Sequence, residues 1–555
     1  MANAKDILEA FGKLESDRAS FDGLYRECAE YCMPPEQAIG QRNQPVQEGR
    51  EYIGPVDSIG IRCAQLLASG LYSNTISSGQ QWFRLRSRDE KLNDHEEVKA
   101  YWDAVSDRSL KALQNSNFSL EVHELHVAFV VFGTGVMFSE LTDGARLSFQ
   151  HHSVRNVYLA EGLEGRIDTL YRQFWLTATQ AVRKFPKSVS SEVRRAASNP
   201  QTAQDKYPFV HYVGPRESVA TGAKGARAMP YASLYIERKA ETIVSESGFE
   251  EFPFAAPRFS KLDGEVYGRS PAMSALPDLR MVSRASEDWI DAVEMAVVPP
   301  VFLPDVEGME RTDLRPGAIN VYDPTRGGSP VMYKAGGDTQ VGMDFITRKD
   351  TAIEQMFMVD LFQMFQAAAG GKNMTATEVA ERVGEKIQAI APVVSRLQSE
   401  LYQPVIERVV TLLGHAGLLP DPPAVLRGSQ YDVVYTSRLD ARLSETENRN
   451  MLKFLAEAGQ AVQIVSAAPA LTALVDIDQI IKRLAQNDNV PATLIRTTRE
   501  VEKHRKQMAQ AQAQAQQRQL LADKIAPVDI TKPIQDESPM MALAAAAASG
   551  MAGME

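Results

Sequence analysis

The chain has 555 residues, of which 44% are hydrophobic, 24% charged and 8% aromatic. These are ordinary proportions for globular proteins, so they exclude a wholly disordered or collagen-like chain. The length predicts about three or four domains. The formal net charge of −11 at pH 7 disfavours a protein that grips nucleic acid over a broad basic surface, but it allows one past which DNA slides.

The number of cysteines and the length of the apolar runs indicate the cellular compartment in which the protein is expected. Three cysteines, Cys28, Cys32 and Cys63, are too few and odd in number for a secreted disulfide scaffold. Cys28 and Cys32 are four residues apart in a predicted helix and so share one face; a zinc pair is the alternative interpretation. We find no signal peptide and no apolar run of the ~18 to 20 residues that span a bilayer. We therefore expect a soluble intracellular product with reduced thiols and no membrane anchor.

The segment 1–265 predicts one mixed α+β region. Apolar residues recur at helical spacing from the N-terminus to about position 75, around a polar loop that runs from Pro34 to Pro55. A strand is expected at 81–86, followed by helices near 98–110 and 121–132. Further strands are expected at 136–138, 146–149, 157–159, 209–213 and 233–236, with a short helical insert at 176–200.

Two helices around a small β-rich module are the most informative pattern in the chain. The first helix carries an apolar stripe and ends at Pro299-Pro300, because proline removes a helical hydrogen-bond donor. A segment rich in proline and glycine, 299–340, then predicts short strands joined by turns. The second helix begins near Gly342. The candidate stem-packing residues are Leu279, Val282, Trp289 and Val293 in the first helix, and Ile346, Ile353 and Phe357 in the second.

The C-terminal part predicts a flexible loop followed by helices. Residues 367–373 are flexible by composition, and the capping box Thr375-x-x-Glu378 starts a helix that reaches about Leu413. Kinks are expected at Pro392 and Pro404 within this helix. The segment 444–525 reads as helical, and the tail 526–555 as disordered.

Motifs of catalysis are incomplete. Gly370-Gly371-Lys372-Asn373 superficially resembles a phosphate-binding loop, but Gln366 stands where the first glycine is needed and Asn373 where a serine or threonine is needed. His123 and His126 are three residues apart, whereas zinc proteases space their histidines by four. We therefore expect no catalytic residues, no metal site and no cofactor.

The order of these elements resembles that of portal proteins, the head-to-tail connectors of short-tailed bacteriophages. No single motif is specific, but their order over residues 1 to about 430 is. The stretches that carry the resemblance are 67–72 (LASGLY), 81–85 (QWFRL), 132–136 (FGTGV), 266–271 (VYGRSP), 275–278 (ALPD), 298–300 (VPP), 314–318 (LRPGA), 375–379 (TATEV) and 417–420 (GLLP).

The resemblance implies an α+β, mainly helical protomer with the parts of a portal subunit. Residues 1–265 would form the wing, and the two-helix stem would consist of 266–298 and 341–365. The remaining parts would be the β-rich clip at 299–340, the tunnel loop at 366–374, the long kinked helix and wing return at 375–429, the helical crown at 430–525, and a disordered tail at 526–555.

The same resemblance implies a non-catalytic ring, usually of twelve copies, at one vertex of the capsid in the virion. The ring would be the channel for packaging and ejecting double-stranded DNA, and it would assemble in the host cytoplasm. Implied partners are the large terminase subunit, a tail adaptor protein, the major capsid and scaffolding proteins, and optionally internal core proteins. Alternatives are another virion component, such as a tail tube or internal core protein, and a packaging enzyme.

Candidate channel residues follow from these assignments. The loop residues Gly370, Gly371, Lys372 and Asn373 would face DNA, with Lys372 as the main cation; a solvated loop lysine is the alternative. Arg348 and Lys349 would line the stem, together with the acidic Glu287 and Asp291. The alternative for the two cations is pairing with Glu287, Asp288 or Asp291 of a neighbouring subunit, and the apolar stem stripes would be buried between subunits.

Overall fold

The computed structural model describes residues 3–34, 55–76, 81–142, 146–216, 225–304, 313–322, 339–361, 389–426 and 430–437, and scattered residues from 503 to 514. The chain divides into two compact units, Met1–Pro491 and Ala492–Glu555. The described residues of the second unit are helical. The expected tunnel loop 366–374, the start of the long helix, most of the crown and the tail 526–555 lie outside the described residues.

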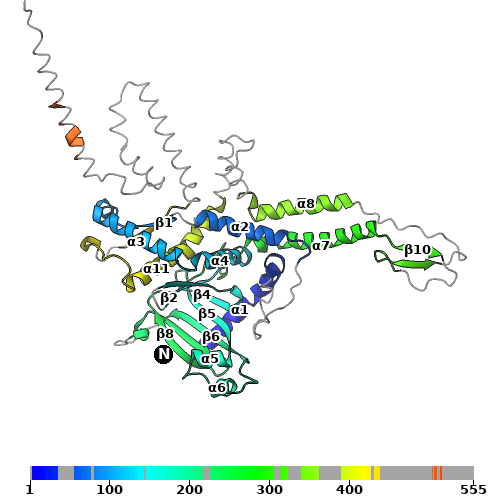
Figure 1. The fold of residues 1–555 in the computed structure, drawn as a ribbon, viewed down its shortest axis with the longest axis horizontal. Helices are drawn as coiled ribbons and strands as arrows, with labels where there is room; N and C mark the ends of the chain where they lie inside the picture. Colours follow the sequence, from blue (N-terminus) through cyan, green and yellow to red (C-terminus); the bar gives the residue numbers. More distant parts are fainter. Residues whose placement is uncertain are drawn as a thin grey trace, which may run out of the picture. The chain divides into compact units, whose positions relative to one another are not determined.

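A five-stranded antiparallel sheet forms one half of the first unit (Figure 1). Its order is β4-β5-β6-β7-β8. Helix α1 covers one face, where Phe11 packs between the rings of Tyr158 and Tyr171. These elements are α1 (Ala4–Cys32), β4 (Val157–Glu161), β5 (Ile167–Thr177), β6 (Lys206–Pro215), β7 (Tyr231–Glu237) and β8 (Thr242–Phe249).

The other face of this sheet is covered by two groups of elements. One is the small sheet β3-β2-β9, whose Phe138 and Phe254 pack against residues of β4, β5 and β6. The other is a pair of short helices, α5 and α6, whose Phe185 and Val193 pack on Phe209. The bounds are β2 (Met137–Thr142), β3 (Arg146–His151), β9 (Phe254–Ala255), α5 (Ala178–Lys184) and α6 (Ser191–Ser198).

Helices surround the largest hydrophobic core. Helix α4 is buried over most of its length and ends at Gly133, whose φ of +74° suits a residue without a side chain. A strand pair, β1 and β12, closes this core, and β12 returns from the far end of the described chain. The elements are α2 (Ile59–Thr75), α3 (Glu96–Gln114), α4 (Phe118–Phe132), α11 (Gln403–His415), β1 (Phe83–Ser87) and β12 (Tyr431–Tyr435).

The mixture of helix and strand expected for the segment 1–265 is confirmed, including the helical insert that starts at the capping box of Thr177. One expectation is wrong in detail. The helical crown was predicted from position 430 onward, but Tyr431–Tyr435 is a strand that pairs antiparallel with β1. The segment is rich in valine and tyrosine, which favour strands, and it pairs along the edge of β1, so that tertiary partner decides its structure.

The helical segment before α11 contains a π-helical turn, η6 (Gln398–Tyr402). Its wider turn joins residues 389–397 to α11 just before Pro404, which has no backbone N–H to donate. The kinks expected at Pro392 and Pro404 stay predictions. None of the helices in the described part combines the length and apolar character that a bilayer crossing requires.

Candidate channel-forming hairpin

The two helices predicted around the β-rich module form a hairpin that extends from the helical core (Figure 1). Helix α7 (Pro271–Val297) runs outward, and α8 (Thr339–Met356) returns beside it. Ser270 caps α7 by accepting a hydrogen bond from the Met273 amide, 3.1 Å away. The chain leaves α7 at Val298, immediately before Pro299-Pro300, as predicted. Helix α8 ends at Met356, before the expected boundary at 365, and Met358 has a φ of +52°.

The predicted stem-packing residues form the seam between the helices and their attachment to the core. Five of them are buried, and Trp289 and Val293 are half-buried. A methyl group on Gly342 would lie 3.1 Å from the Trp289 ring, so the helices approach closely there. The expectation that these stripes are buried between subunits is wrong, because the hairpin's own second helix already covers the first. The buried five are Leu279, Val282, Ile346, Ile353 and Phe357.

A second set of apolar side chains on the hairpin stays exposed. Most large apolar residues that are exposed in the described part of the chain lie on α7, α8 or the segment between them. Exposed apolar side chains concentrated on one part of a fold are typical of an interaction surface. We call this set the exposed hairpin surface: Met281, Ile290, Val297, Val298, Val301, Leu303, Leu314, Ile319, Val341, Met343, Phe345 and Met356.

The charged residues expected to line the stem are not equivalent. Lys349 donates to Asp278 of α7 at 2.7 Å, and both side chains are largely buried. This pair ties the two helices of one protomer together. Arg348, Glu287 and Asp291 are exposed, so they are available to solvent or to a molecule outside the protomer.

The segment between the helices contains two parallel strands, β10 (Val301–Pro304) and β11 (Ile319–Tyr322). Asn320 is 3% exposed and bridges the backbone of Asp313 through two hydrogen bonds of 2.7 Å. Gly317 has a φ of +71°, which favours glycine at the turn before β11. In the described part of the β-rich tip, backbone and amide contacts therefore join the two strands and the turn between them. The expected strand near 331–333 lies outside the described residues.

Two of the sequence stretches that carry the family resemblance, 132–136 and 266–271, meet at the base of the hairpin. Gly133, after α4, lies against Gly268, which precedes α7: a side chain on Gly268 would lie 3.1 Å from the Gly133 carbonyl carbon and closer to its oxygen. Thr134 accepts from the Gly268 amide at 2.9 Å, and Ser270 donates to the Val131 carbonyl at 2.8 Å. The direction in which α7 leaves the core is thus fixed by close backbone contact.

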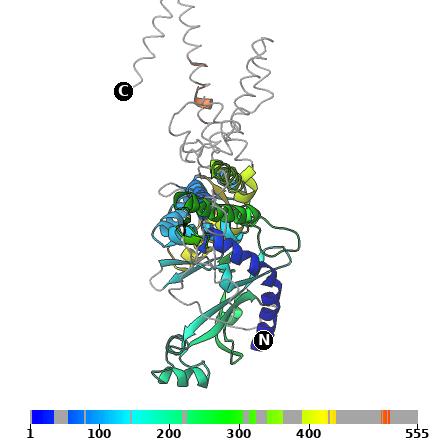
Figure 2. The same cartoon turned by 90° about the vertical axis from the view of Figure 1, so that its right-hand side faces the viewer.

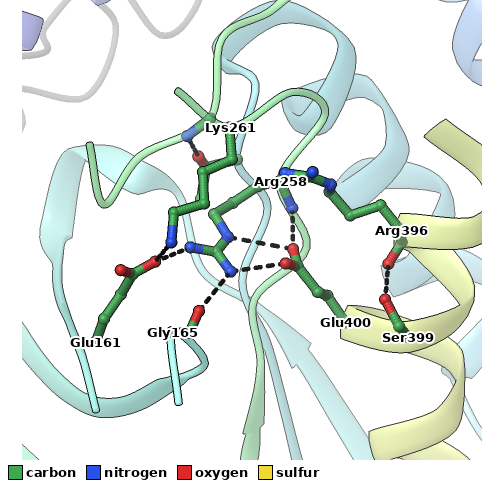
Figure 3. A network of polar contacts seen from close by, with 9 residues as sticks. Glu161, Gly165, Arg258, Lys261, Arg396, Ser399 and Glu400 are labelled. Atoms are coloured by element: carbon green, nitrogen blue, oxygen red, sulfur yellow. Dashed lines mark hydrogen bonds and ion pairs between the residues drawn. The ribbon is translucent and has the colours of Figure 1, made fainter. Parts of the chain in front are cut away.

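A buried arginine joins this base to the sheet and to the π-helical turn (Figure 3). Arg258 is 3% exposed. Its guanidinium donates to Glu400 of η6 at 2.6 Å, to Glu161 of β4 and to the Gly165 carbonyl at 3.1 Å. Burial raises the pKa of Glu161, but hydrogen bonds from Lys261 and Arg258 outweigh that effect, so its pKa lies below the ordinary value. Sequence inspection missed this network, because its members lie far apart along the chain.

The π-helical turn also carries a buried hydrogen-bond chain. The Tyr402 hydroxyl lies 2.7 Å from the Thr75 hydroxyl and 2.9 Å from Nε2 of His126. Burial lowers the pKa of His126 to about 4, so this imidazole is neutral at pH 7. His126 therefore serves as a core hydrogen-bonding residue. Among the described residues, no group of histidine, cysteine and acidic side chains has a geometry that could hold a metal ion.

Comparisons with known proteins bear on this architecture. The chain is 28% identical to a "Probable portal protein" of Bordetella phage BPP-1, over 95% of this chain and 96% of that protein. It is 27% identical to a "Portal protein" of Salmonella phage epsilon15, over 91% of each. A solved structure titled "Neck of empty GTA particle computed with C6 symmetry" matches at 12% identity over 76% of this chain and 94% of that chain. Its TM-score of 0.33 is too low to support an argument.

The sequence profile of one family matches residues 4–495. This range includes both helices of the hairpin, its β-rich tip, the Gly133–Gly268 contact and the Arg258 network. The chain belongs to the family of bacteriophage head-to-tail connecting proteins.

Proposed function

We propose that this chain is the subunit of a portal ring at one vertex of a phage capsid, with the hairpin helices around the channel. The exposed hairpin surface is the observation that carries the proposal. Burying these apolar side chains between subunits lowers the free energy by roughly 25 cal/mol for each Å² of apolar surface removed from water. An identical copy offers a matching surface at every position of a closed ring.

The ring serves as the passage for double-stranded DNA during packaging and ejection. A conduit must let a polyanion slide, which suits a net charge of −11. On the hairpin, α8 carries the exposed Arg348, and α7 carries the exposed acidic residues Glu287 and Asp291. We assign Lys372, with Gly370, Gly371 and Asn373, to the tunnel loop that meets the strand.

The remaining assignments follow the expected division into wing, stem, clip and crown. The β-rich tip, 299–340, is the docking point for the large terminase subunit and later for the tail adaptor. The major capsid and scaffolding proteins surround the ring, and assembly takes place in the host cytoplasm. The protein itself has no catalytic role, in keeping with a family whose members are generally structural.

Electron microscopy of the purified full-length protein tests the ring directly. We expect closed rings with a central hole of at least ~20 Å, wide enough for duplex DNA. Compact monomers at high protein concentration would contradict the proposal. The double variant Ile290→Lys/Phe345→Lys should lower ring yield strongly, because it places charge on the exposed hairpin surface.

The control is Leu163→Lys, which changes an even more exposed apolar residue, in the turn between β4 and β5. It should assemble as the unmodified protein does. If both variants assemble normally, the exposed hairpin surface does not hold the ring together.

The channel assignment has a separate test. Lys372→Ala should change the amount or length of packaged DNA in a phage-packaging assay while leaving rings intact. Loss of rings in this variant would refute the tunnel-loop assignment. ATP hydrolysis or metal-dependent DNA cleavage that disappears with a single carboxylate substitution would instead favour an enzyme.

A further inference from the structure

The helix pair α5–α6 concentrates positive charge on an acidic chain. Between residues 178 and 198 there are five basic residues and a single acidic one, Glu192. The five basic side chains are all exposed. We call them the basic helix-pair surface: Arg183, Lys184, Lys187, Arg194 and Arg195.

This charge is not neutralised by neighbouring carboxylates. Glu192 pairs with Lys239, outside the helix pair. Arg194 donates to the Lys187 carbonyl at 2.8 Å, and Arg195 donates to the Ser191 carbonyl at 3.3 Å. Within the part of the chain that the structure describes, none of the five basic side chains forms an ion pair with an acidic residue.

The surface stands on a well-anchored platform. The capping box of Thr177 and Gln180 starts α5. Ser190 caps α6, and its own amide and hydroxyl both donate to Glu237 of β7. Phe185 and Val193 are buried against the sheet beneath. Four of the five basic residues therefore lie on anchored helices, and Lys187 lies in the short link between them. The anchored backbone limits the entropy lost when the surface binds a partner.

The helix pair lies far from the channel-forming hairpin. Figures 1 and 2 both place α5 and α6 at the end of the five-stranded sheet furthest from α2 and α8. A partner of this surface therefore meets the periphery of the subunit, and not the bore that the hairpin is proposed to surround.

We propose that the basic helix-pair surface binds the phosphate backbone of duplex DNA without sequence preference. Between residues 178 and 198 no large apolar side chain is exposed. A protein partner usually needs a buried apolar or aromatic centre at its docking site, whereas backbone phosphates need only well-placed cations. The inference rests on the proposed function in one respect, which is that DNA is the polyanion the subunit meets.

Fluorescence anisotropy with a labelled duplex, measured on the full-length protein between 50 and 200 mM salt, tests this. Each phosphate contact contributes about 0.9 to the slope of log affinity against log salt. Arg194→Gln/Arg195→Gln should therefore reduce the slope by roughly 2 and weaken binding by on the order of tenfold per lost contact at low salt.

Two matched controls separate charge from structure. Arg194→Lys/Arg195→Lys keeps both charges and should retain the slope. Arg88→Gln removes an exposed arginine that lies just after β1, outside the hairpin, 3.0 Å from Asp432, and should leave binding unchanged.

An unchanged slope in Arg194→Gln/Arg195→Gln would overturn the inference, and so would the absence of duplex binding by the unmodified protein at 50 mM salt. Binding of poly-glutamate without binding of DNA would also overturn it, in favour of an acidic protein partner. Ring formation is scored separately by microscopy. The binding result decides this inference whether or not rings form, so its failure is distinguishable from failure of the ring proposal.

Discussion

Replacing Arg258 with methionine should loosen the base of the hairpin from both the sheet and the π-helical turn. Arg258→Met keeps the length and much of the apolar stem of the side chain, but it removes the guanidinium that Glu400, Glu161 and the Gly165 carbonyl share. The backbone amide of residue 258 still donates to Glu400, at 2.8 Å, so the variant removes charge pairing without removing every contact.

The size of the effect follows from burial. Removing one partner of a buried ion pair costs about 3–5 kcal/mol, mainly because the other charge is left without compensation. The side chains of Glu161 and Glu400 are each 20% exposed, and Glu161 keeps Lys261 at 2.6 Å. We therefore expect the lower end of the range, about 3 kcal/mol.

Native-state hydrogen exchange measures this locally. A loss of about 3 kcal/mol corresponds to roughly 150-fold faster exchange, since each 1.4 kcal/mol is a factor of ten. The faster exchange should be confined to peptides that cover 131–136, 161–167, 256–270 and 396–404. Arg88→Met removes an exposed pair with Asp432 and should change exchange little, because exposed pairs contribute at most about 1 kcal/mol.

The charge argument has its own check. Adding Glu400→Gln to Arg258→Met should recover part of the lost protection, because the uncompensated carboxylate is then neutral. Exchange in Arg258→Met that differs less than about fivefold from the unmodified protein would refute the reasoning, since about 1 kcal/mol is already available from an exposed pair.

Three further outcomes are expected. Gly268→Ala should lower the melting temperature and the soluble yield, because the added methyl group meets the Gly133 carbonyl; we expect a loss of about 1–3 kcal/mol in the free energy of unfolding. The control Gly12→Ala, which has open space in α1, should be neutral or stabilising. Equal melting temperatures for the two variants would contradict this. Lys349→Met should cost about 1–3 kcal/mol in urea unfolding by leaving the largely buried Asp278 unpaired, and Asp278→Asn in the same chain should recover part of it; a neutral single variant would show that the pair does not join the helices. Burial lowers the pKa of His126 to about 4, so His126 contributes fully to the stability of the fold at pH values above its unfolded pKa, near 6.5, and this stability falls by about 2 kcal/mol by pH 5. His126→Gln should therefore make the free energy of unfolding less sensitive to pH between 6.5 and 5. An unchanged pH profile would argue against a neutral buried imidazole.

Much of the fold was accessible from local patterns. The helices α4 and α7 were predicted from apolar spacing and from their terminators, a glycine and a proline pair, because these signals act within a few residues. The strand at Tyr431–Tyr435 was missed because its partner is β1, at Phe83–Ser87 near the other end of the described chain, and no local pattern reports such a partner. Helix α8 also ends earlier than expected, at Met356, just before the fully buried Phe357.

The sequence by itself determined the order of elements, the paired helices around a β-rich tip and the likeness to phage portal proteins. Only the tertiary structure decided which apolar residues of the hairpin are buried within one protomer and which remain exposed. It also brought Gly133 to Gly268 and placed Arg258 between Glu161 and Glu400. The physical reason is that periodicity specifies which face of a helix is apolar, while burial and ion pairing depend on which distant segment comes to lie against that face.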